Sequence, residues 1–177
     1  MNPLKQYRIG FVGLSTGKHQ FSFEVGPDFF SSFDVAAFDA GKLFLELELE
    51  KSNTMLAFHF RFNGEVSLEC DRCLEQFNLE LSFERHLLVK FGESYVEQSD
   101  EILIIPATES HVDISQFVYE FIHLGLPVRH VHPDAPDGVP GCNREVLEKL
   151  KQYQGKPGSG KADKDSPWEA LRGMQFD

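Results

Sequence analysis

The stretch "KLFLELELEKSNTMLAFHFRFNG", residues 42–64, decides the fold class of this 177-residue chain. In its first half leucine alternates with Phe or Glu, and its second half places Leu and Phe at every other position. Successive side chains of a β-strand point to opposite faces, so a period of two indicates a strand with one buried face. The stretch therefore predicts two neighbouring strands, 42–50 and 54–62, that are joined by a turn at "KSN".

Further strands are predicted on both sides of this pair. Residues 7–25 predict an opening hairpin, and "NG" at 63–64 predicts a turn into a strand that ends at Cys70. Residues 77–91 alternate again, and "EILIIP" at 101–106 adds another strand. The centre is thus predicted to be an antiparallel β-meander of about five to seven strands, and the sequence leaves open whether it curls into a partly closed barrel.

The period changes after residue 112. Asp113 is predicted to be the N-cap of a long helix, with Gln116 completing a capping box and Gly125 ending the helix. Its apolar residues recur at helical spacing, at Ile114, Phe117, Val118, Phe121 and Ile122. A helix with one apolar side is expected to pack on one face of the sheet, which gives an α+β fold class.

The remaining chain predicts one domain and a tail. Residues 1–153 are predicted to form a single α+β domain that closes with a loop at 128–142 and a helix capped by Asn143. Residues 154–166 are rich in Gly, Lys and Ser and predict a flexible linker. Residues 167–177 predict a short C-terminal helix or tail, in which Trp168 and Leu171 would dock on the domain or on a partner.

The charge of the chain restricts its partners. The formal net charge is -11, and residues 1–141 hold 22 acidic and 10 basic residues, a net charge of -12. Affinity for nucleic acid comes largely from Lys and Arg, so this balance argues against a broad nucleic-acid-binding face. It fits a protein that binds a basic partner, and equally one that is merely soluble. The N-terminus resembles no signal peptide and there is no membrane-spanning run, so we expect a cytoplasmic protein without membrane contact.

Cys70 and Cys73 form the C-x-x-C pair "ECDRCLE". Two thiolates at this spacing can bind one Zn²⁺ from a tight turn, and a structural site needs two further ligands. Cys142 and either His132 or His130 are the candidates, because all three lie in the loop at 128–142. The alternative is that Cys70 is a buried strand residue and Cys73 an ordinary thiol. A dithiol oxidoreductase is disfavoured, because a strand and not a helix follows the pair.

Other catalytic signatures are absent from the sequence. It contains no G-x-x-x-x-G-K-[ST], G-x-G-x-x-G, H-E-x-x-H or G-x-S-x-G motif. No catalytic residue is therefore predicted. An enzyme that uses Cys70 and Cys73, with thiol or zinc chemistry, and a general protein-interaction module remain the alternatives to a non-catalytic role.

Several segments together resemble a known family. The segments "VSLECDRCLEQFNLELSFERHLLVKF", "VDISQFVYEFIHLGLPVRHVHP", "CNREVLEKLKQY" and "PWEALRGM" are similar, in this order, to the YceD family of large ribosomal RNA subunit accumulation proteins. The resemblance covers about residues 40–174 and implies a non-enzymatic factor in ribosome biogenesis. It implies as partner either the precursor of large-subunit ribosomal RNA or a basic large-subunit ribosomal protein, of which the acidic charge favours the second.

The chain departs from this family in its second cysteine region. Many relatives carry several cysteines in the loop after the long helix, and these would complete an all-cysteine zinc site with the first pair. Here that loop offers Cys142, His130 and His132. Either a histidine replaces a cysteine as ligand, or this branch has lost the metal. Cys70 and Cys73 correspond to the family pair, and the resemblance assigns no RNA-contacting residue.

Overall fold

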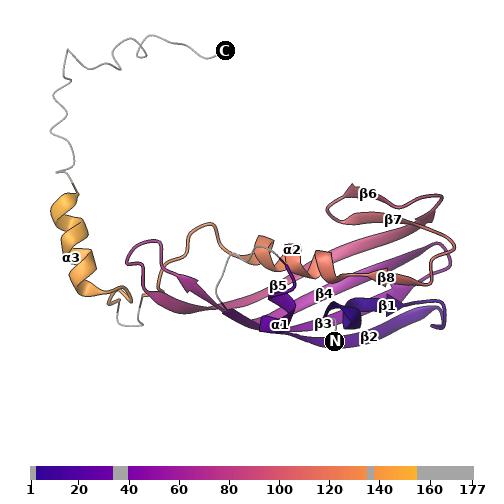
Figure 1. Cartoon of the computed structure of the whole chain (residues 1–177), viewed down its shortest axis with the longest axis horizontal. Coiled ribbons are helices and arrows are strands. Elements are labelled where there is room, and N and C mark those ends of the chain that lie inside the picture. The colour runs from indigo at the N-terminus through magenta and orange to yellow at the C-terminus, as the bar shows by residue number, and fades with distance from the viewer. Residues whose placement is uncertain (1–2, 34–39, 135–137, 155–177) are drawn as a thin grey trace, which may run out of the picture.

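The computed structural model describes residues 3–33, 40–134 and 138–154 and has an α+β fold, as predicted (Figure 1). Six strands form one sheet in the order β2-β3-β4-β5-β7-β6, and β1 and β8 form a separate pair. The strands are β1 (Arg8–Gly10), β2 (Gly17–Val25), β3 (Ala40–Lys51), β4 (Met55–Glu69), β5 (Gln76–Gly92), β6 (Val96–Ser99), β7 (Ile102–Pro106) and β8 (His111–Asp113). The helices are η1 (Pro3–Tyr7), α1 (Pro27–Phe30), α2 (Ser115–Gly125) and α3 (Arg144–Tyr153).

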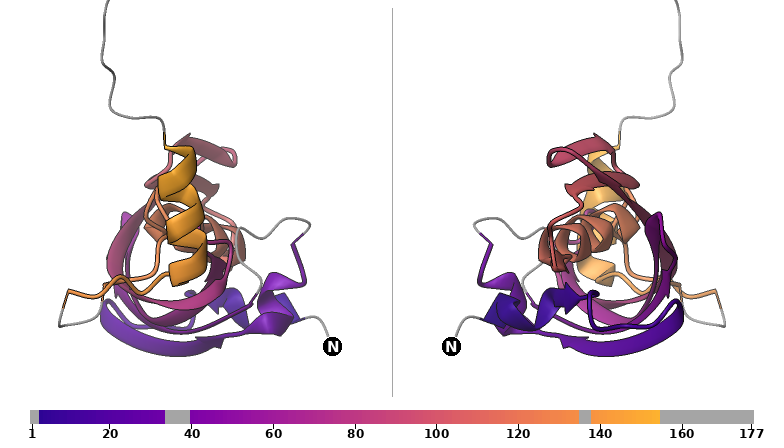
Figure 2. Two further views of the ribbon diagram at one scale, coloured as in Figure 1. Left: turned by 90° about the vertical axis from the view of Figure 1, so that its left-hand side faces the viewer. Right: turned by 90° about the vertical axis from the view of Figure 1, so that its right-hand side faces the viewer.

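The sheet is long and curved, and its two faces differ in polarity. Figure 2 shows α2 lying within the curve of the sheet. The alternating Leu and Phe residues of β3 and β4 point to this inner face and are buried in the core, as the sequence predicted. Phe60, at the centre of β4, contacts Phe121 of α2 with ring centroids 5.3 Å apart. The other, outer face consists of the solvent-facing residues of β2 to β5.

The predicted turn at "NG" is wrong, because β4 runs without interruption through Asn63 and Gly64. Gly64 has a φ of +156°, and a Cβ at this position would lie 2.3 Å from the carbonyl oxygen of Lys42 on β3. The glycine is therefore required by the close approach of two strands. The chain turns instead at Cys70 to Glu75, between β4 and β5.

The predicted opening hairpin is also wrong. β1 pairs with β8, with Ile9 opposite Val112, whereas β2 pairs with β3. Lys51 holds the intervening segment in place, because its Nζ donates hydrogen bonds to the carbonyl oxygens of Phe11 and Leu14. The partner of the short strand β1 lies far along the chain, and the local sequence does not indicate it.

The sheet is neither wholly antiparallel nor closed. β7 pairs with β5 in parallel, with Leu88 opposite Ile102, because β6 lies between them in sequence and at the edge of the sheet. Within the described residues β2 and β6 are the two edges and do not pair with each other. The antiparallel meander is therefore confirmed for β2 to β5, and the closed form of the barrel is not adopted.

Helix α2 begins at Ser115, one residue later than predicted, and ends as predicted at Gly125. Asp113 belongs to β8, and its Oδ1 accepts hydrogen bonds from the backbone N–H and the hydroxyl of Ser115. Gln116 donates to Glu120 and forms no capping box with Asp113. Asp113 thus accepts the hydrogen bond of a free backbone N–H at the start of α2, although it lies outside the helix, as Asp commonly does in turns.

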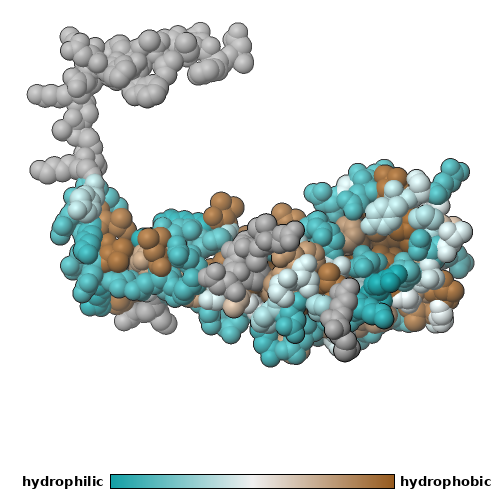
Figure 3. All heavy atoms as spheres, viewed as in Figure 1, coloured by the Kyte–Doolittle hydropathy of each residue, from teal (hydrophilic) through white to brown (hydrophobic). Residues whose placement is uncertain are grey.

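Helix α3 begins after Asn143, as predicted, and projects from the end of the sheet that carries the β4–β5 turn (Figure 1). Of its described residues none is buried, and Leu150 is 39% exposed. Figure 3 shows hydrophobic residues on the surface at this end of the molecule. The predicted linker and C-terminal helix lie outside the described residues from position 155 onward, and so remain predictions. Among the helices described here, none is long and apolar enough to cross a membrane.

Candidate metal centre

Two segments that are distant in sequence bring three thiols and one imidazole together. Cys70 and Cys73 lie in the β4–β5 turn, and His132 and Cys142 lie in the loop between α2 and α3. One ligand atom from each residue lies within 4.8 Å of those of the other three. We call these four residues the Cys/His cluster. His130 is not part of it.

The β4–β5 turn places both of its thiols on the same side. The Cys70 N–H donates to the Glu75 carbonyl oxygen at 3.0 Å, and the Leu74 N–H donates to the Cys70 carbonyl oxygen at 2.9 Å. Leu74 adopts a φ of +62°, which is uncommon for a residue with a side chain. This left-handed residue lets the chain reverse within the turn, and its side chain stays exposed.

The second segment is fastened to the turn by backbone contacts. The Asp71 N–H donates to the His130 carbonyl oxygen at 2.7 Å, and the His130 N–H donates to Asp71 Oδ2 at 2.6 Å. Two residues further on, the His132 ring packs on Phe77 of β5, with centroids 4.7 Å apart. His130 thus contributes its backbone to the site, and His132 contributes its side chain.

Gly141 allows Cys142 to approach the same point. A Cβ on Gly141 would lie 2.3 Å from the Pro133 carbonyl oxygen, so the backbones of these two loop residues are in direct contact. Asn143, the next residue, donates from Nδ2 to Glu75 Oε1 at 2.7 Å and caps α3 through its Oδ1. The turn, the loop and the start of α3 therefore meet at the cluster.

The distances within the cluster fit a tetrahedral metal site. Tetrahedral bonds of about 2.3 Å to sulfur and 2.0 Å to nitrogen place ligand atoms about 3.5–3.8 Å apart. The Cys70 and Cys142 sulfurs are 3.7 Å apart, and His132 Nδ1 lies 3.4 Å from the Cys73 sulfur and 3.8 Å from the Cys142 sulfur. The three cysteines are free thiols and are buried, so the donor set and its shielding suit structural Zn²⁺.

The thiols have perturbed pKa values. Burial raises the pKa of Cys70, but hydrogen bonds from the backbone amides of Arg72, Cys73 and His132 outweigh it and lower that pKa to about 6. Burial, together with the neighbouring Cys70 and Cys73 thiols, raises the pKa of Cys142. Metal ligands must be deprotonated, so the backbone amides around Cys70 prepare one sulfur for binding.

Arg72 contacts the cluster in a way that the sequence did not suggest. Its Nε–H donates to the Cys142 sulfur at 3.2 Å, although the two residues are 70 positions apart in the chain. The position of Arg72 between two cysteines was visible in the sequence. Its partner was not, because that depends on how the loop folds back.

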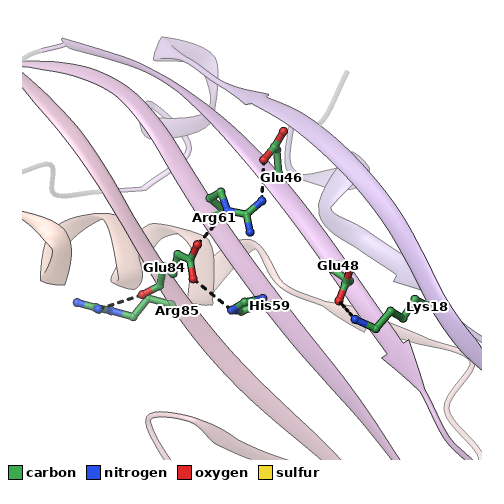
Figure 4. Close-up of polar contacts among 7 residues, drawn as sticks. All are labelled: Lys18, Glu46, Glu48, His59, Arg61, Glu84 and Arg85. Atoms are coloured by element: carbon green, nitrogen blue, oxygen red, sulfur yellow. Dashed lines mark hydrogen bonds and ion pairs between the residues drawn. The ribbon is translucent and has the colours of Figure 1, made fainter.

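Charged residues on the outer face form a second group of polar contacts (Figure 4). Arg61 bridges Glu46 and Glu84, and Lys18 pairs with Glu48 at 2.7 Å. Glu46 and Glu48 of β3 therefore lie on a solvated strand face, and they are held by ion pairs across strands. Pairs of this kind contribute little to stability, because water screens them.

The fold and the cluster together define a class: an α+β protein with an open sheet, in which a Cys₃His cluster joins a peripheral loop to a strand turn. The family model described as "Large ribosomal RNA subunit accumulation protein YceD" matches residues 58–175, which is about two thirds of the chain. The protein belongs to this family. Neither the curated proteins nor the solved structures gave a match.

The match begins within β4 and includes both segments of the Cys/His cluster. Strands β1 to β3 lie before the matched residues, and so do the aromatic residues of the N-terminal part of the chain. The description of the family supports a role in ribosome biogenesis, as the resemblance in sequence implied.

Proposed function

We propose that this protein is a non-enzymatic ribosome-biogenesis factor that supports the accumulation of large-subunit ribosomal RNA in the cytoplasm. The family match over residues 58–175 carries this proposal. A thiol-dependent enzyme is less favoured, because reactive cysteines are partly exposed, whereas Cys70 is 0% and Cys73 4% exposed.

One structural Zn²⁺ is the proposed cofactor, with Cys70, Cys73, His132 and Cys142 as its ligands. The close approach of the four ligand atoms, all within 4.8 Å of one another, and the burial of the thiols support this assignment. When bound, the ion supplies a cross-link between the β4–β5 turn and the loop that precedes α3. It fixes the position of α3, which has few apolar contacts of its own.

The proposed partner is a basic ribosomal protein of the large subunit. The outer face carries eight acidic and four basic side chains, a net charge of -4. The acidic residues are Glu24, Glu46, Glu48, Glu50, Glu65, Glu69, Glu80 and Glu84, and the basic ones are Lys18, Lys42, Arg61 and Lys90. Such a face attracts a basic partner and repels the phosphates of RNA.

One pair on the outer face supports a cationic partner in particular. Glu65 on β4 lies directly opposite Glu80 on β5. Like charges at opposite positions of two strands destabilise a sheet, so this pair favours a Lys or Arg side chain from outside. Asn78 donates to Glu65 at 3.4 Å, which offsets the repulsion only in part.

The biological role can be tested by complementation. In cells that lack the protein, we expect the ratio of large-subunit to small-subunit ribosomal RNA to fall and to recover with the wild-type gene. A Cys73→Ser gene should restore it incompletely, while an Arg129→Gln gene should restore it fully. An unchanged ribosomal RNA ratio in the deletion strain would overturn the proposed function.

The partner can be tested by measuring binding to purified large-subunit ribosomal proteins and to large-subunit ribosomal RNA over a range of salt. We expect binding to one or more basic proteins, and a double Glu65→Gln, Glu80→Gln variant should bind them several-fold more weakly. The matched control is Glu93→Gln, Glu109→Gln, which removes two exposed charges away from the outer face. Tight binding to the RNA that resists salt would contradict the choice of a protein partner.

A further inference from the structure

We propose that Arg72 is a positioning residue of the metal centre, which holds Cys142 as a ligand and balances the charge of the loaded cluster. The inference rests on the proposed Zn²⁺. Three thiolates and a neutral imidazole give Zn²⁺ a net charge of -1, and the three sulfurs are buried. A buried charge is costly unless a group of opposite sign is hydrogen-bonded to it.

Arg72 is placed to supply that opposite charge. It lies in the β4–β5 turn between two of the ligands, and its Nε–H donates to the sulfur of the third ligand, Cys142, at 3.2 Å. Its side chain therefore crosses from one segment of the cluster to the other. The contact joins the same two segments as the metal does.

The surroundings of Arg72 leave its guanidinium directed to the cluster. Asp71, the adjacent carboxylate, accepts the backbone N–H of His130. The Cys142 sulfur accepts the Nε–H of Arg72, so the arginine and the three thiolates of the loaded cluster form one group of compensating charges.

A hydrogen bond to a ligand sulfur has two effects on the metal. It fixes the direction of the Cys142 side chain, and it withdraws electron density from the thiolate, which makes protonation of that sulfur less favourable. Residues that support ligands in this way typically change metal affinity by about 10- to 100-fold when they are replaced. Lysine keeps the charge but lacks the planar Nε–H donor, so it should replace arginine only in part.

The test compares Zn²⁺ affinity, by competition with a chromogenic chelator, in wild type, Arg72→Gln, Arg72→Lys and the control Arg129→Gln. The control removes the same charge from an exposed residue of the loop that carries His132 and Cys142. We expect the dissociation constant to rise about 10- to 100-fold in Arg72→Gln, to rise less in Arg72→Lys, and to stay within about twofold in the control. Arg72→Gln should also release the metal at a higher pH than wild type.

Cobalt(II) spectra provide a readout that a change in folding alone would not give. The intensity of the thiolate-to-cobalt charge-transfer band reports how many sulfurs bind, so Arg72→Gln should lose intensity from Cys142, whereas Arg72→Lys retains more of it. The role of Arg72 would be overturned if Arg72→Gln equalled wild type in Zn²⁺ affinity, in the pH at which the metal is released and in its cobalt(II) spectrum. A wild-type protein that binds neither Zn²⁺ nor Co²⁺ would instead overturn the metal centre itself.

Discussion

In the middle of the sheet Phe60 is fully buried between its strand neighbours and α2, whereas at the far end of β4 and β5 helix α3 has none of its described residues buried. The first region is stabilised by removing apolar side chains from water. The second is assembled from hydrogen bonds, a capping residue and four potential metal ligands.

The difference points to a structural role for the Cys/His cluster at this end of the sheet. The core includes Cys70, Cys73 and Cys142, which lie at the end of the sheet that carries the β4–β5 turn. Beyond them, α3 offers only Val146 and Leu147 as partly buried contacts. A helix of 10 residues has little stability alone, so its position depends on how its first residues are held.

Phe60→Ala should have the largest effect on the free energy of unfolding. It removes a ring that is 0% exposed and that packs on Phe62 and Phe121. A loss of about 3–5 kcal/mol is expected in urea denaturation, because a cavity remains in the core. Phe44→Ala, on the outer face, is the control and should cost far less, since that ring is 55% exposed. Equal effects of the two substitutions would contradict the division into inner and outer faces.

Removal of the metal should unfold one region and leave the other intact. In Cys73→Ser, or in wild type treated with a strong chelator, we expect faster hydrogen exchange in residues 138–154 and in the β4–β5 turn. Amides of β3 and in the middle of β4 should remain protected, because the core around Phe60 is formed by β4 and α2 and not by the loop. Loss of protection across the whole sheet would show that the two regions are not separate.

High pH should destabilise the core through Tyr7. Burial raises the pKa of Tyr7 to about 12, although a hydrogen bond with Gln6 acts in the opposite direction. The folded state therefore retains the proton more strongly than the unfolded state, whose pKa is near 10. This contribution to stability is complete below about pH 10 and is lost as pH rises through about 12.

Urea unfolding at several pH values checks the Tyr7 prediction. Tyr7→Phe should lose less stability than wild type between about pH 10 and 12, since it has no phenol to ionise there. Tyr153→Phe, at an exposed position, should behave like wild type. If all three proteins lose stability equally, Tyr7 does not contribute to alkaline unfolding.

Asn143→Ala should have the smallest effect, and one confined to the cluster end. It removes the cap on the Glu145 and Val146 amides and the contact with Glu75, which together should cost about 1 kcal/mol. Hydrogen exchange of α3 should become faster by about fivefold while β4 is unchanged. Asn78→Ala, an exposed asparagine of β5, is the control, and an α3 that exchanges equally slowly in both variants would contradict the role of the cap.

The sequence was sufficient for features that repeat or act locally. Alternation in 42–62 and 77–91 predicted β3, most of β4 and β5, because a period of two is a direct result of strand geometry. Asn143 was identified as a cap because that effect depends on the next three residues. The turn at Asn63 and Gly64 was predicted wrongly, because the same glycine that permits a turn also permits two strands to approach closely.

The candidate site was predictable in its residue types and not in its assembly. The spacing of Cys70 and Cys73 indicated a metal pair, and composition indicated Cys142 and a loop histidine. The choice between His130 and His132 as the side chain near the thiols required the backbone pairing with Asp71. Whether the cluster binds Zn²⁺ stays a prediction.

The sequence by itself determined the α+β class, the buried and exposed faces of the long strands and the family, because each of these follows from local patterns of residues. The tertiary structure alone decided that β1 pairs with β8, that β7 joins β5 in parallel, and that Arg72 meets Cys142. These contacts join residues far apart in the chain. They form only when the loops close and the core has packed, so no local pattern encodes them.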